Sequence, residues 1–230
     1  MHVAILSSEA VPFAKTGGLG DVAGALPKAL REASDTDAVL ILPLHEQTDR
    51  RLLRDRIIDN LEFEWPRGGT RRSARVWYSE ASGAPAYLID APRYFSRPEI
   101  YGYPDDHERY AFFCRAALAL LERLDNPPNI VHCNDWPCGF AAVELLARRN
   151  RDAFYAHTRT IFSIHNLAYQ GVFDPFELTR LGFGAADERA AFMMGGAASA
   201  LKAGLATSDM LSTVSPRYAL EIQTPEQGFN

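Results

Sequence analysis

Several common features are missing from this sequence of 230 residues, and each absence excludes a class of protein. No apolar run approaches the ~20 residues that a membrane-spanning helix needs. Met1 and His2 lead directly into an apolar segment, which leaves no room for the charged and apolar regions of a secretory signal. We therefore expect a cytoplasmic protein that does not use a membrane.

Positive charge is also scarce. Lysine and arginine number 24 against 29 acidic residues, which gives a formal net charge of −5. A nucleic acid or an anionic membrane surface attracts a protein through a basic face, so this balance argues against both partners. With 47% hydrophobic residues and no internal repeat or long linker, residues 1–230 are expected to form one domain with a large core.

Cysteine is rare, and the three that occur, Cys114, Cys133 and Cys138, show no C-x-x-C spacing. An odd number without such spacing is typical of reduced thiols in the cytosol. A zinc site built from Cys133, Cys138, His132 and His165 is an alternative. Because His132 and Cys133 are neighbours on an expected strand, their side chains leave opposite faces and cannot easily share one metal. We therefore expect no metal site.

What the sequence does contain is an alternation of short apolar strands and amphipathic helices. Strands are expected at 3–6, 39–44, 57–65, 74–80, 86–90, 129–132 and 159–164, and helices at about 19–33, 106–124 and 137–149. Three successive strands without a helix form a β-rich insertion. The remaining βαβ order predicts an α/β, Rossmann-like, doubly wound fold with a mainly parallel sheet covered on both faces. The stripe of the first helix that should face this sheet consists of Leu19, Val22, Leu26, Ala29 and Leu30.

The loop after the first strand is rich in glycine. It reads Lys15-Thr16-Gly17-Gly18-Leu19-Gly20-Asp21-Val22 and runs into the first helix. Glycines let a backbone approach a ligand closely, and a helix N-terminus presents free N–H groups and the positive end of its dipole. With the charge of Lys15 added, the segment predicts a site for a phosphorylated ligand.

Two other interpretations of this loop remain open. Gly18 to Ala23 fits the dinucleotide fingerprint G-x-G-x-x-A, and Glu46 follows the next strand where a ribose-binding acid would lie. In the dinucleotide fold the first glycine follows the strand almost at once, whereas here Ser7 to Gly17 intervene. An NAD-dependent Rossmann oxidoreductase therefore fits the spacing less well. The loop could also be a solvated turn without a ligand.

Polar loops follow three of the expected parallel strands, and parallel sheets bind ligands at the carboxyl ends of their strands. These loops are Glu9 to Gly20, Asn134-Asp135-Trp136, and His165 to Gly171. Together they offer carboxylates, amides, an imidazole and aromatic rings. A sugar needs this mixture, since its hydroxyls require donors and acceptors while its C–H face packs on a ring.

Four motifs, in order along the chain, also carry a resemblance to a known family. They are the glycine-rich segment 15–22, His132-Cys133-Asn134-Asp135-Trp136, the segment IHNLAYQG at 164–171, and Thr213-Val214-Ser215-Pro216 followed by the segment EIQTPE at 221–226. They resemble the motifs of bacterial glycogen synthases and plant starch synthases. The resemblance runs from Met1 to the last residues. It implies the N-terminal half of a GT-B glycosyltransferase and retaining transfer of glucose from ADP-glucose or UDP-glucose to the non-reducing end of an α-1,4-glucan.

The resemblance also implies roles for individual residues. The diphosphate of the donor, whose negative charge grows as it leaves, would be bound by Lys15, Gly17 and Gly18. His165 would hydrogen-bond the transferred glucose, and its backbone carbonyl would face the anomeric carbon. Hydroxyls of donor or acceptor would be bound by Asp21, Asp135 and Asn166, and the glucan side of the cleft would be shaped by Tyr169 and Gln170. Neither a metal nor another cofactor is implied.

Some of these residues also have an ordinary structural explanation. Asp135 could be a helix N-cap ahead of Pro137, His165 could be a core histidine with satisfied hydrogen bonds, and Asp21 could complement the helix dipole. Two positions depart from the family pattern. Pro137 stands where the family usually has histidine, which stiffens the loop, and Phe95 stands at a tyrosine or phenylalanine position, so no hydroxyl is expected there.

The resemblance further implies a second, C-terminal nucleotide-binding domain, which is absent from residues 1–230. We therefore expect an acceptor-side half that is incomplete as an enzyme on its own. A non-catalytic glucan-binding module that uses the same cleft remains an alternative.

Overall fold

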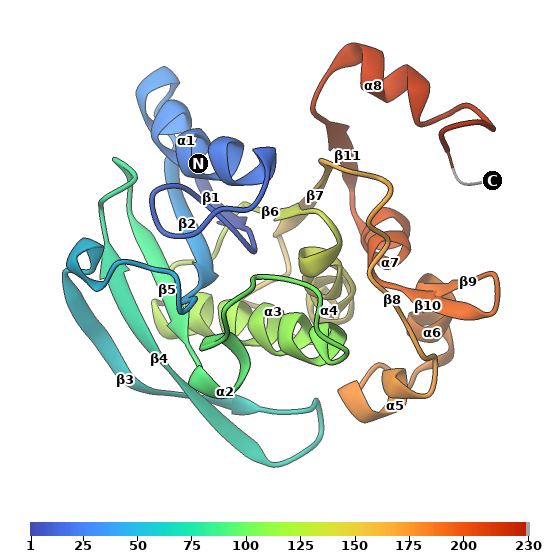
Figure 1. The fold of residues 1–230 in the computed structure, drawn as a ribbon. Coiled ribbons are helices and arrows are strands. Elements are labelled where there is room, and N and C mark those ends of the chain that lie inside the picture. The colour runs from blue at the N-terminus through green and yellow to red at the C-terminus, as the bar shows by residue number, and fades with distance from the viewer. Residues whose placement is uncertain (229–230) are drawn as a thin grey trace.

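The computed structural model describes residues 1–228, and its centre is an eight-stranded sheet in the order β11-β7-β6-β1-β2-β5-β4-β3 (Figure 1). Its strands are β1 (His2–Leu6), β2 (Asp37–Pro43), β3 (Asp55–Glu64), β4 (Arg71–Ser79), β5 (Ala86–Asp90), β6 (Ile130–Asn134), β7 (Arg159–Ile164) and β11 (Met210–Thr213). Neighbours from β11 through β5 run parallel, whereas β4 pairs antiparallel with β5, and β3 with β4. The predicted mainly parallel sheet with a β-rich insertion is confirmed.

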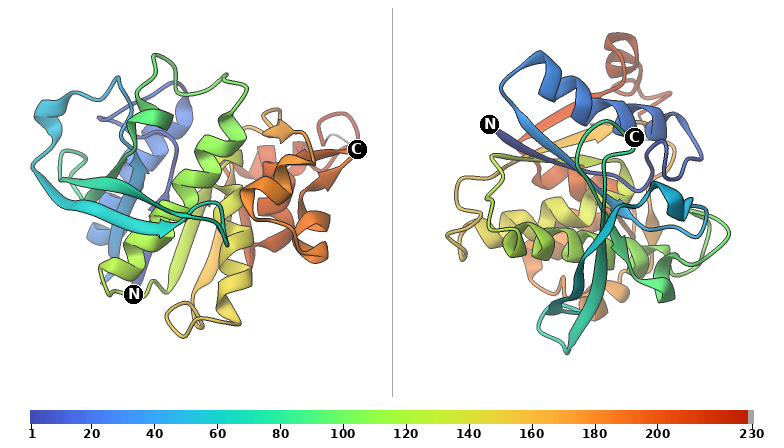
Figure 2. Two further views of the ribbon diagram at one scale, coloured as in Figure 1. Left: turned by 90° about the horizontal axis from the view of Figure 1, so that it is seen from below. Right: turned by 90° about the vertical axis from the view of Figure 1, so that its left-hand side faces the viewer.

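Helices cover both faces of this sheet (Figures 1 and 2). Along β1, Val3 and Ile5 face the cluster formed with α1, while Ala4 and Leu6 face the cluster formed with α3 and α4. Such alternation is expected of a strand buried on both sides. The helices and helical turns are α1 (Gly18–Ala33), η1 (Arg50–Leu52), α2 (Pro92–Phe95), α3 (Asp106–Arg123), η2 (Trp136–Cys138), α4 (Gly139–Arg149), α5 (Glu177–Leu181), α6 (Ala186–Phe192), α7 (Ala200–Thr207) and α8 (Pro216–Glu221).

A small three-stranded sheet was not expected from the sequence. It contains β8 (Val172–Phe173), β10 (Ala197–Ser199) and β9 (Met193–Met194), in that order, and lies beside α5, α6 and α7 (Figure 1). Its strands have two or three residues each, which is too short for a period-2 pattern to show.

The predicted inward stripe of α1 is partly wrong. Val22 and Ala29 are exposed, while Ala23 and Pro27 are buried. Small residues face inward because the helix lies very close to the loop after β1: a Cβ on Gly24 would lie 2.4 Å from the carbonyl oxygen of Val11. Close approach therefore outweighs hydrophobic patterning on this helix.

The helix expected at 137–149 also begins differently. A 3₁₀ turn, η2, comes first, and α4 starts only at Gly139. Glycine is required there, since a Cβ would lie 1.9 Å from the carbonyl oxygen of Ala200 in α7. Asp135 thus lies between the end of β6 and this turn, whose first residue is Trp136.

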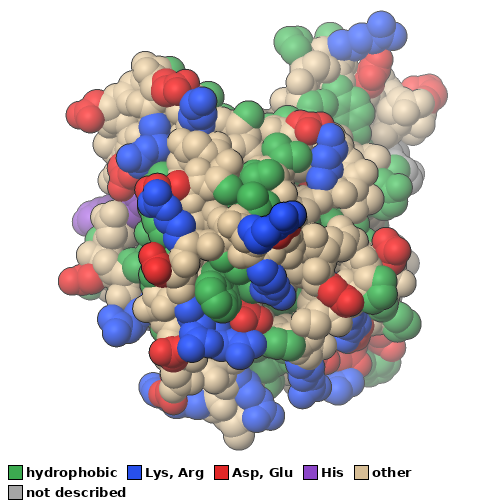
Figure 3. Space-filling model, turned by 60° about the vertical axis from the view of Figure 1, so that its left-hand side comes forward, with side chains coloured by type: hydrophobic (Ala, Val, Ile, Leu, Met, Phe, Trp, Pro, Cys, Tyr) green, Lys and Arg blue, Asp and Glu red, His purple; other side chains and the backbone are tan. Residues whose placement is uncertain are grey.

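Charges of both signs share the surface in Figure 3, where Lys and Arg side chains lie among Asp and Glu side chains. Exposed ion pairs such as Arg71–Glu62, at 3.0 Å, connect them. None of the helices within residues 1–228 is long and apolar enough to cross a membrane.

Candidate functional site

A cleft of about 1060 Å³ opens at the carboxyl ends of β1, β6, β7 and β11. The sheet changes its winding direction here, because β2 lies on one side of β1 and β6 on the other. Open α/β sheets bind ligands at such a switch point. The three polar loops meet in this cleft, whose lining consists of Glu9, 16–19, Val22, 101–104, Asp106, His107, 135–137, 165–166, 168–172 and Val214.

The predicted cation of the glycine-rich loop is engaged in an ion pair. Lys15 Nζ donates to both carboxylate oxygens of Asp21, at 2.7 and 2.6 Å. Both side chains are exposed, by 43% and 60%, and they lie beside the cleft lining, which includes Gly17 and Gly18. Asp21 is in the first turn of α1, so it also complements the helix dipole.

Glu9 is a residue of this site to which the sequence analysis gave no role. Its carboxylate accepts hydrogen bonds from the backbone N–H groups of Thr16 and Gly17, the latter at 3.1 Å. The side chain is buried, and burial raises its pKa while these two bonds lower it. The sequence signal that could have identified Glu9 is its position as an acidic residue between a strand and a glycine-rich loop. Gly18 is open, since a Cβ there would meet no heavy atom within 4 Å.

Asp135 connects two strand ends. Its Oδ1 accepts from the backbone N–H of His165 at 2.8 Å and of Asn166 at 3.3 Å. It forms no side-chain cap on η2, so the N-cap explanation is wrong. Its backbone has φ 55° and ψ −178°, a conformation that costs energy in a residue other than glycine and that clusters at functional sites. Burial, with a smaller contribution from the charge of Glu9, raises the pKa of this carboxyl to about 6.

His165 is half-buried and lines the cleft, so it is not a residue of the packed core. Its Nε2 lies 3.0 Å from Oδ1 of Asn134, whose Nδ2 donates to the carbonyl oxygen of Leu6 at 2.9 Å. That bond fixes Oδ1 of Asn134 as an acceptor, so Nε2 carries the proton and Nδ1 is left as an acceptor. Burial lowers the pKa of the imidazole, which favours this neutral form.

The other predicted residues of the His165 loop behave differently from one another. Asn166 is exposed, and its Oδ1 accepts from the N–H of Ala168 at 3.0 Å. Tyr169 has 65% of its surface exposed at the cleft. The side chain of Gln170 bonds within the protein, donating to the carbonyl oxygen of Leu167 at 2.6 Å and accepting from Ser199 Oγ at 3.3 Å.

The two departures from the family pattern have different positions. Pro137 lines the cleft, whereas Phe95 is fully buried outside it. Trp136, which also lines the cleft, packs so closely on Gly171 that a Cβ there would lie 2.5 Å from the indole Cε3. The aromatic loop 101–104 is a further wall that the sequence analysis missed.

The zinc alternative finds no support in the geometry. His132 Nε2 lies 2.6 Å from Ser163 Oγ, while Cys133 and Cys138 are buried in the core cluster between the sheet and the helices α3 and α4. Among residues 1–228, no group of three or more His, Cys, Asp or Glu side chains is placed to hold a metal ion.

Comparisons with known proteins agree with these motifs. The starch synthase catalytic domain family matches residues 2–230. The glycogen synthase of Clostridium beijerinckii is 43% identical over 232 residues, which cover 99% of this chain and 48% of that protein. The glycogen synthase of Desulforudis audaxviator is 40% identical, with 99% and 47% covered.

A solved structure shows the same fold. The catalytic domain of starch synthase IV from Arabidopsis thaliana, bound to ADP and acarbose, matches with a TM-score of 0.86 and 31% identity, over 99% of this chain and 47% of that one. The chain thus spans about half the length of the curated relatives it matches. These matches leave no support for an NAD-dependent oxidoreductase. The chain belongs to the family of starch synthase catalytic domains.

Proposed function

We propose that residues 1–230 form the acceptor-side domain of a glucosyltransferase, which moves glucose from ADP-glucose or UDP-glucose to the non-reducing end of an α-1,4-glucan. The observation that carries this proposal is the cleft, whose two ends differ in chemistry. At one end the N-terminus of α1 lines the cleft, with Lys15 beside the lining, and at the other end Asp135 and His165 line it. A nucleotide sugar has the same division between a charged diphosphate and a neutral sugar.

At the first end, Lys15 exchanges Asp21 for the diphosphate of the donor. The exchange costs little, because an exposed ion pair of this kind contributes only about 0 to 1 kcal/mol. The open face of Gly18 lets the backbone approach the phosphates. Pre-placed positive charge then stabilises the nucleoside diphosphate as it leaves. The ADP bound to the Arabidopsis relative supports this assignment.

At the second end, Asp135 and His165 hold the transferred glucose. Both backbone bonds to Asp135 use Oδ1, which leaves Oδ2 to accept from a sugar hydroxyl. Nδ1 of His165 accepts from a second hydroxyl, and Asn166 lies next to both. In this arrangement His165 positions the sugar, and its backbone carbonyl faces the anomeric carbon where positive charge develops.

The glucan acceptor packs on the exposed ring of Tyr169, which offers a flat apolar face to sugar C–H groups. Gln170 contributes by holding the loop in shape, since its side chain already bonds Leu167 and Ser199. The three free cysteines of the chain agree with a cytoplasmic location for this activity.

In this proposal a second domain, which corresponds to the half of the relatives that residues 1–230 do not cover, completes the site. The chain spans about half of its relatives, and Lys15 is a single cation for a diphosphate that needs several. The isolated chain therefore binds substrates without transferring glucose.

The test joins residues 1–230 to the C-terminal half of the Clostridium beijerinckii glycogen synthase; we refer to the product as the joined enzyme. Radiolabelled ADP-glucose and UDP-glucose are each incubated with glycogen. We expect incorporation by the joined enzyme and none by residues 1–230 alone. Incorporation by the isolated chain contradicts the need for a second domain. A joined enzyme that folds and binds maltoheptaose but transfers nothing favours the glucan-binding module instead.

A further inference from the structure

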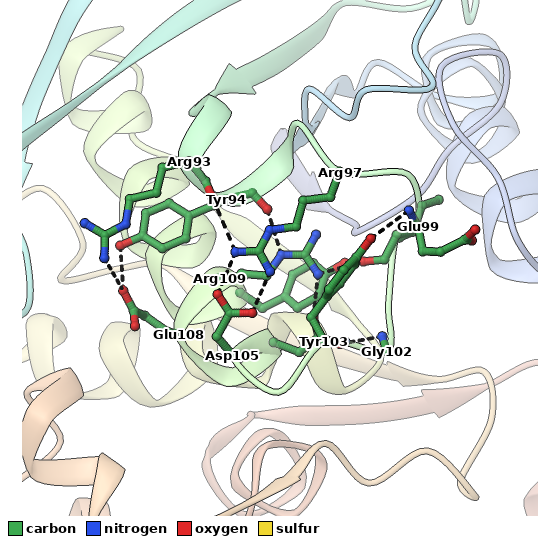
Figure 4. Close-up of polar contacts among 12 residues, drawn as sticks. Arg93, Tyr94, Arg97, Glu99, Gly102, Tyr103, Asp105, Glu108 and Arg109 are labelled. Atoms are coloured by element: carbon green, nitrogen blue, oxygen red, sulfur yellow. Dashed lines mark hydrogen bonds and ion pairs between the residues drawn. The ribbon is translucent and has the colours of Figure 1, made fainter.

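One wall of the cleft is a loop without regular structure, residues 96–105, between α2 and α3. Four of its residues, Tyr101 to Pro104, line the cleft. The loop is nevertheless held by a dense set of side-chain contacts, shown in Figure 4. These contacts converge on Arg109, in the second turn of α3.

Arg109 bonds the chain on both sides of this loop. Its side chain is fully buried, and its Nε donates to the carbonyl oxygen of Tyr94 at 2.7 Å. Its Nη1 donates to the carbonyl oxygen of Ile100 at 3.1 Å and to Oδ1 of Asp106. The same Ile100 oxygen accepts from the hydroxyl of Tyr110 at 2.7 Å. One guanidinium therefore fixes where the loop starts and where it turns toward the cleft.

Tyr103 receives support from two arginines. The guanidinium carbons of Arg97 and Arg109 each lie 4.8 Å from the centroid of its ring. Arg97 is itself held by Asp105, through bonds of 2.6 and 2.7 Å. The Tyr103 hydroxyl accepts from the N–H of Glu99 at 3.0 Å. The ring thus serves to fix the loop.

The loop in turn contacts residues next to the proposed substrate ligands. The hydroxyl of Tyr101 lies 2.7 Å from Ser8 Oγ, beside Glu9. The ring of Tyr101 lies 6.1 Å from that of Trp136, beside Asp135. A displacement of the loop would therefore reach both ends of the cleft.

Burying the guanidinium of Arg109 costs free energy of folding, so a contribution to stability does not by itself explain this residue. Arg109 forms an ion pair with Asp106, but within residues 1–228 the Nη2 of Arg109 has no hydrogen-bond partner. Buried ion pairs are often replaceable, both partners together, by apolar side chains without loss of stability. A geometric role explains why an arginine, with its rigid fork of donors, occupies the position.

We propose that Arg109 is a positioning residue, which holds the 96–105 loop as a wall of the cleft and thereby sets the affinity with which the cleft binds the glucan. The reference to a glucan rests on the proposed function. Arg109 is not among the residues that line the cleft and acts through Ile100, Tyr101 and Tyr103. Lysine at this position would keep the positive charge but lose the planar guanidinium with its fork of hydrogen-bond donors.

The first test needs no substrate. Hydrogen exchange is measured in residues 1–230 for wild type, Arg109→Lys and the matched control Arg93→Lys, whose arginine is exposed on α2, just before the loop. The amides of Gly102 and Tyr103, which donate to Asp106 Oδ2, should exchange about tenfold faster in Arg109→Lys only, while the amides of α4 stay unchanged. Unchanged loop amides, or equal acceleration throughout the chain, would overturn the positioning role.

The second test uses maltoheptaose as the probe. Affinity should fall about tenfold in Arg109→Lys and not in Arg93→Lys. Tyr101→Phe, which removes only the hydroxyl at Ser8 and leaves the bonds of Arg109 in place, should weaken binding less, about threefold. Equal affinities in wild type and Arg109→Lys would contradict the proposal. If wild type binds no maltoheptaose although the exchange result is as expected, the glucan assignment fails and the positioning of the loop by Arg109 stands.

Discussion

The two ends of the cleft are built in opposite ways. Lys15 and Asp21 are exposed and neutralise each other through contacts that water and salt can replace. Asp135 is buried and His165 half-buried; they are bonded to the backbone or to a buried amide, and burial shifts the pKa of each. One end is adjustable, and the other is fixed by the fold.

This difference matches what each part of a nucleotide sugar requires. A diphosphate arrives with its own charge and can displace an exposed carboxylate from a lysine. A neutral sugar cannot reorganise charged groups around it, so its ligands must be in place beforehand. Substitutions at the fixed end should therefore cost the most activity, and those at the adjustable end should depend on salt.

The largest effect is expected at Asp135. In the joined enzyme, Asp135→Ala should lower kcat/KM by an amount that corresponds to about 4 kcal/mol of lost transition-state stabilisation. The substitution removes a proposed sugar ligand and leaves the N–H groups of His165 and Asn166 without their acceptor. Steady-state kinetics with ADP-glucose measure the loss. Asp59→Ala, at an exposed aspartate of β3, is the control. A loss below about tenfold would place Asp135 outside the sugar site.

Lys15→Ala should cost somewhat less, about 2 to 4 kcal/mol of transition-state stabilisation. Lys15→Arg should recover little, since a planar fork does not replace a compact ammonium beside a glycine-rich loop. The loss should shrink as ionic strength rises, because the lysine is exposed. Kinetics at two salt concentrations, with Lys28→Ala of α1 as control, test this; wild-type activity in Lys15→Ala would indicate a solvated turn without a ligand.

At the fixed end, one substitution is expected to increase the stability of the folded state. The pKa of Asp135 rises from the ordinary 3.8 to about 6 on folding, so the folded state binds the extra proton and loses stability as pH rises between these values. Asp135→Asn should stabilise residues 1–230 by about 1 to 3 kcal/mol above about pH 6 and change little below about pH 4. Denaturant unfolding at both pH values measures it, with Asp59→Asn as control. Equal stabilities of variant and wild type above about pH 6 would show that this carboxyl is not destabilised by burial.

The smallest effect is expected at Asp21. Asp21→Asn frees Lys15 and should tighten binding of ADP to the joined enzyme by up to about 1 kcal/mol, the upper range for an exposed pair. Calorimetric titration measures the affinity. Weaker binding would show instead that Asp21 contacts the nucleotide directly.

The fold was predictable from sequence where apolar runs are long enough to show a period. β5 and β7 were expected at their observed bounds. The errors arise where backbone closeness decides, as at Gly24 on α1 and Gly139 at the start of α4, whose contacts come from distant segments. No local pattern encodes such contacts.

The candidate site was predictable where a motif joins several polar residues, as around Asp135 and His165. Glu9 and Asn134 were without a role because their partners, Gly17 and His165, are known only from the fold. Arg109 is a similar case, because its partners are the backbone carbonyls of Tyr94 and Ile100, which only the fold brings next to it.

The most direct test of the fixed end is the pH dependence of kcat/KM for the joined enzyme, in wild type, His165→Gln and His165→Ala. If His165 only positions the sugar and Asp135 carries the ionisation, activity should fall as pH drops through about 6 in wild type and equally in His165→Gln, because the Asp135 carboxylate becomes protonated. His165→Gln should also keep more activity than His165→Ala, since glutamine can still bond Asn134. Loss of the acidic limb together with the imidazole, or equal inactivation of both variants, would show that His165 acts as an acid or base and contradict the positional role.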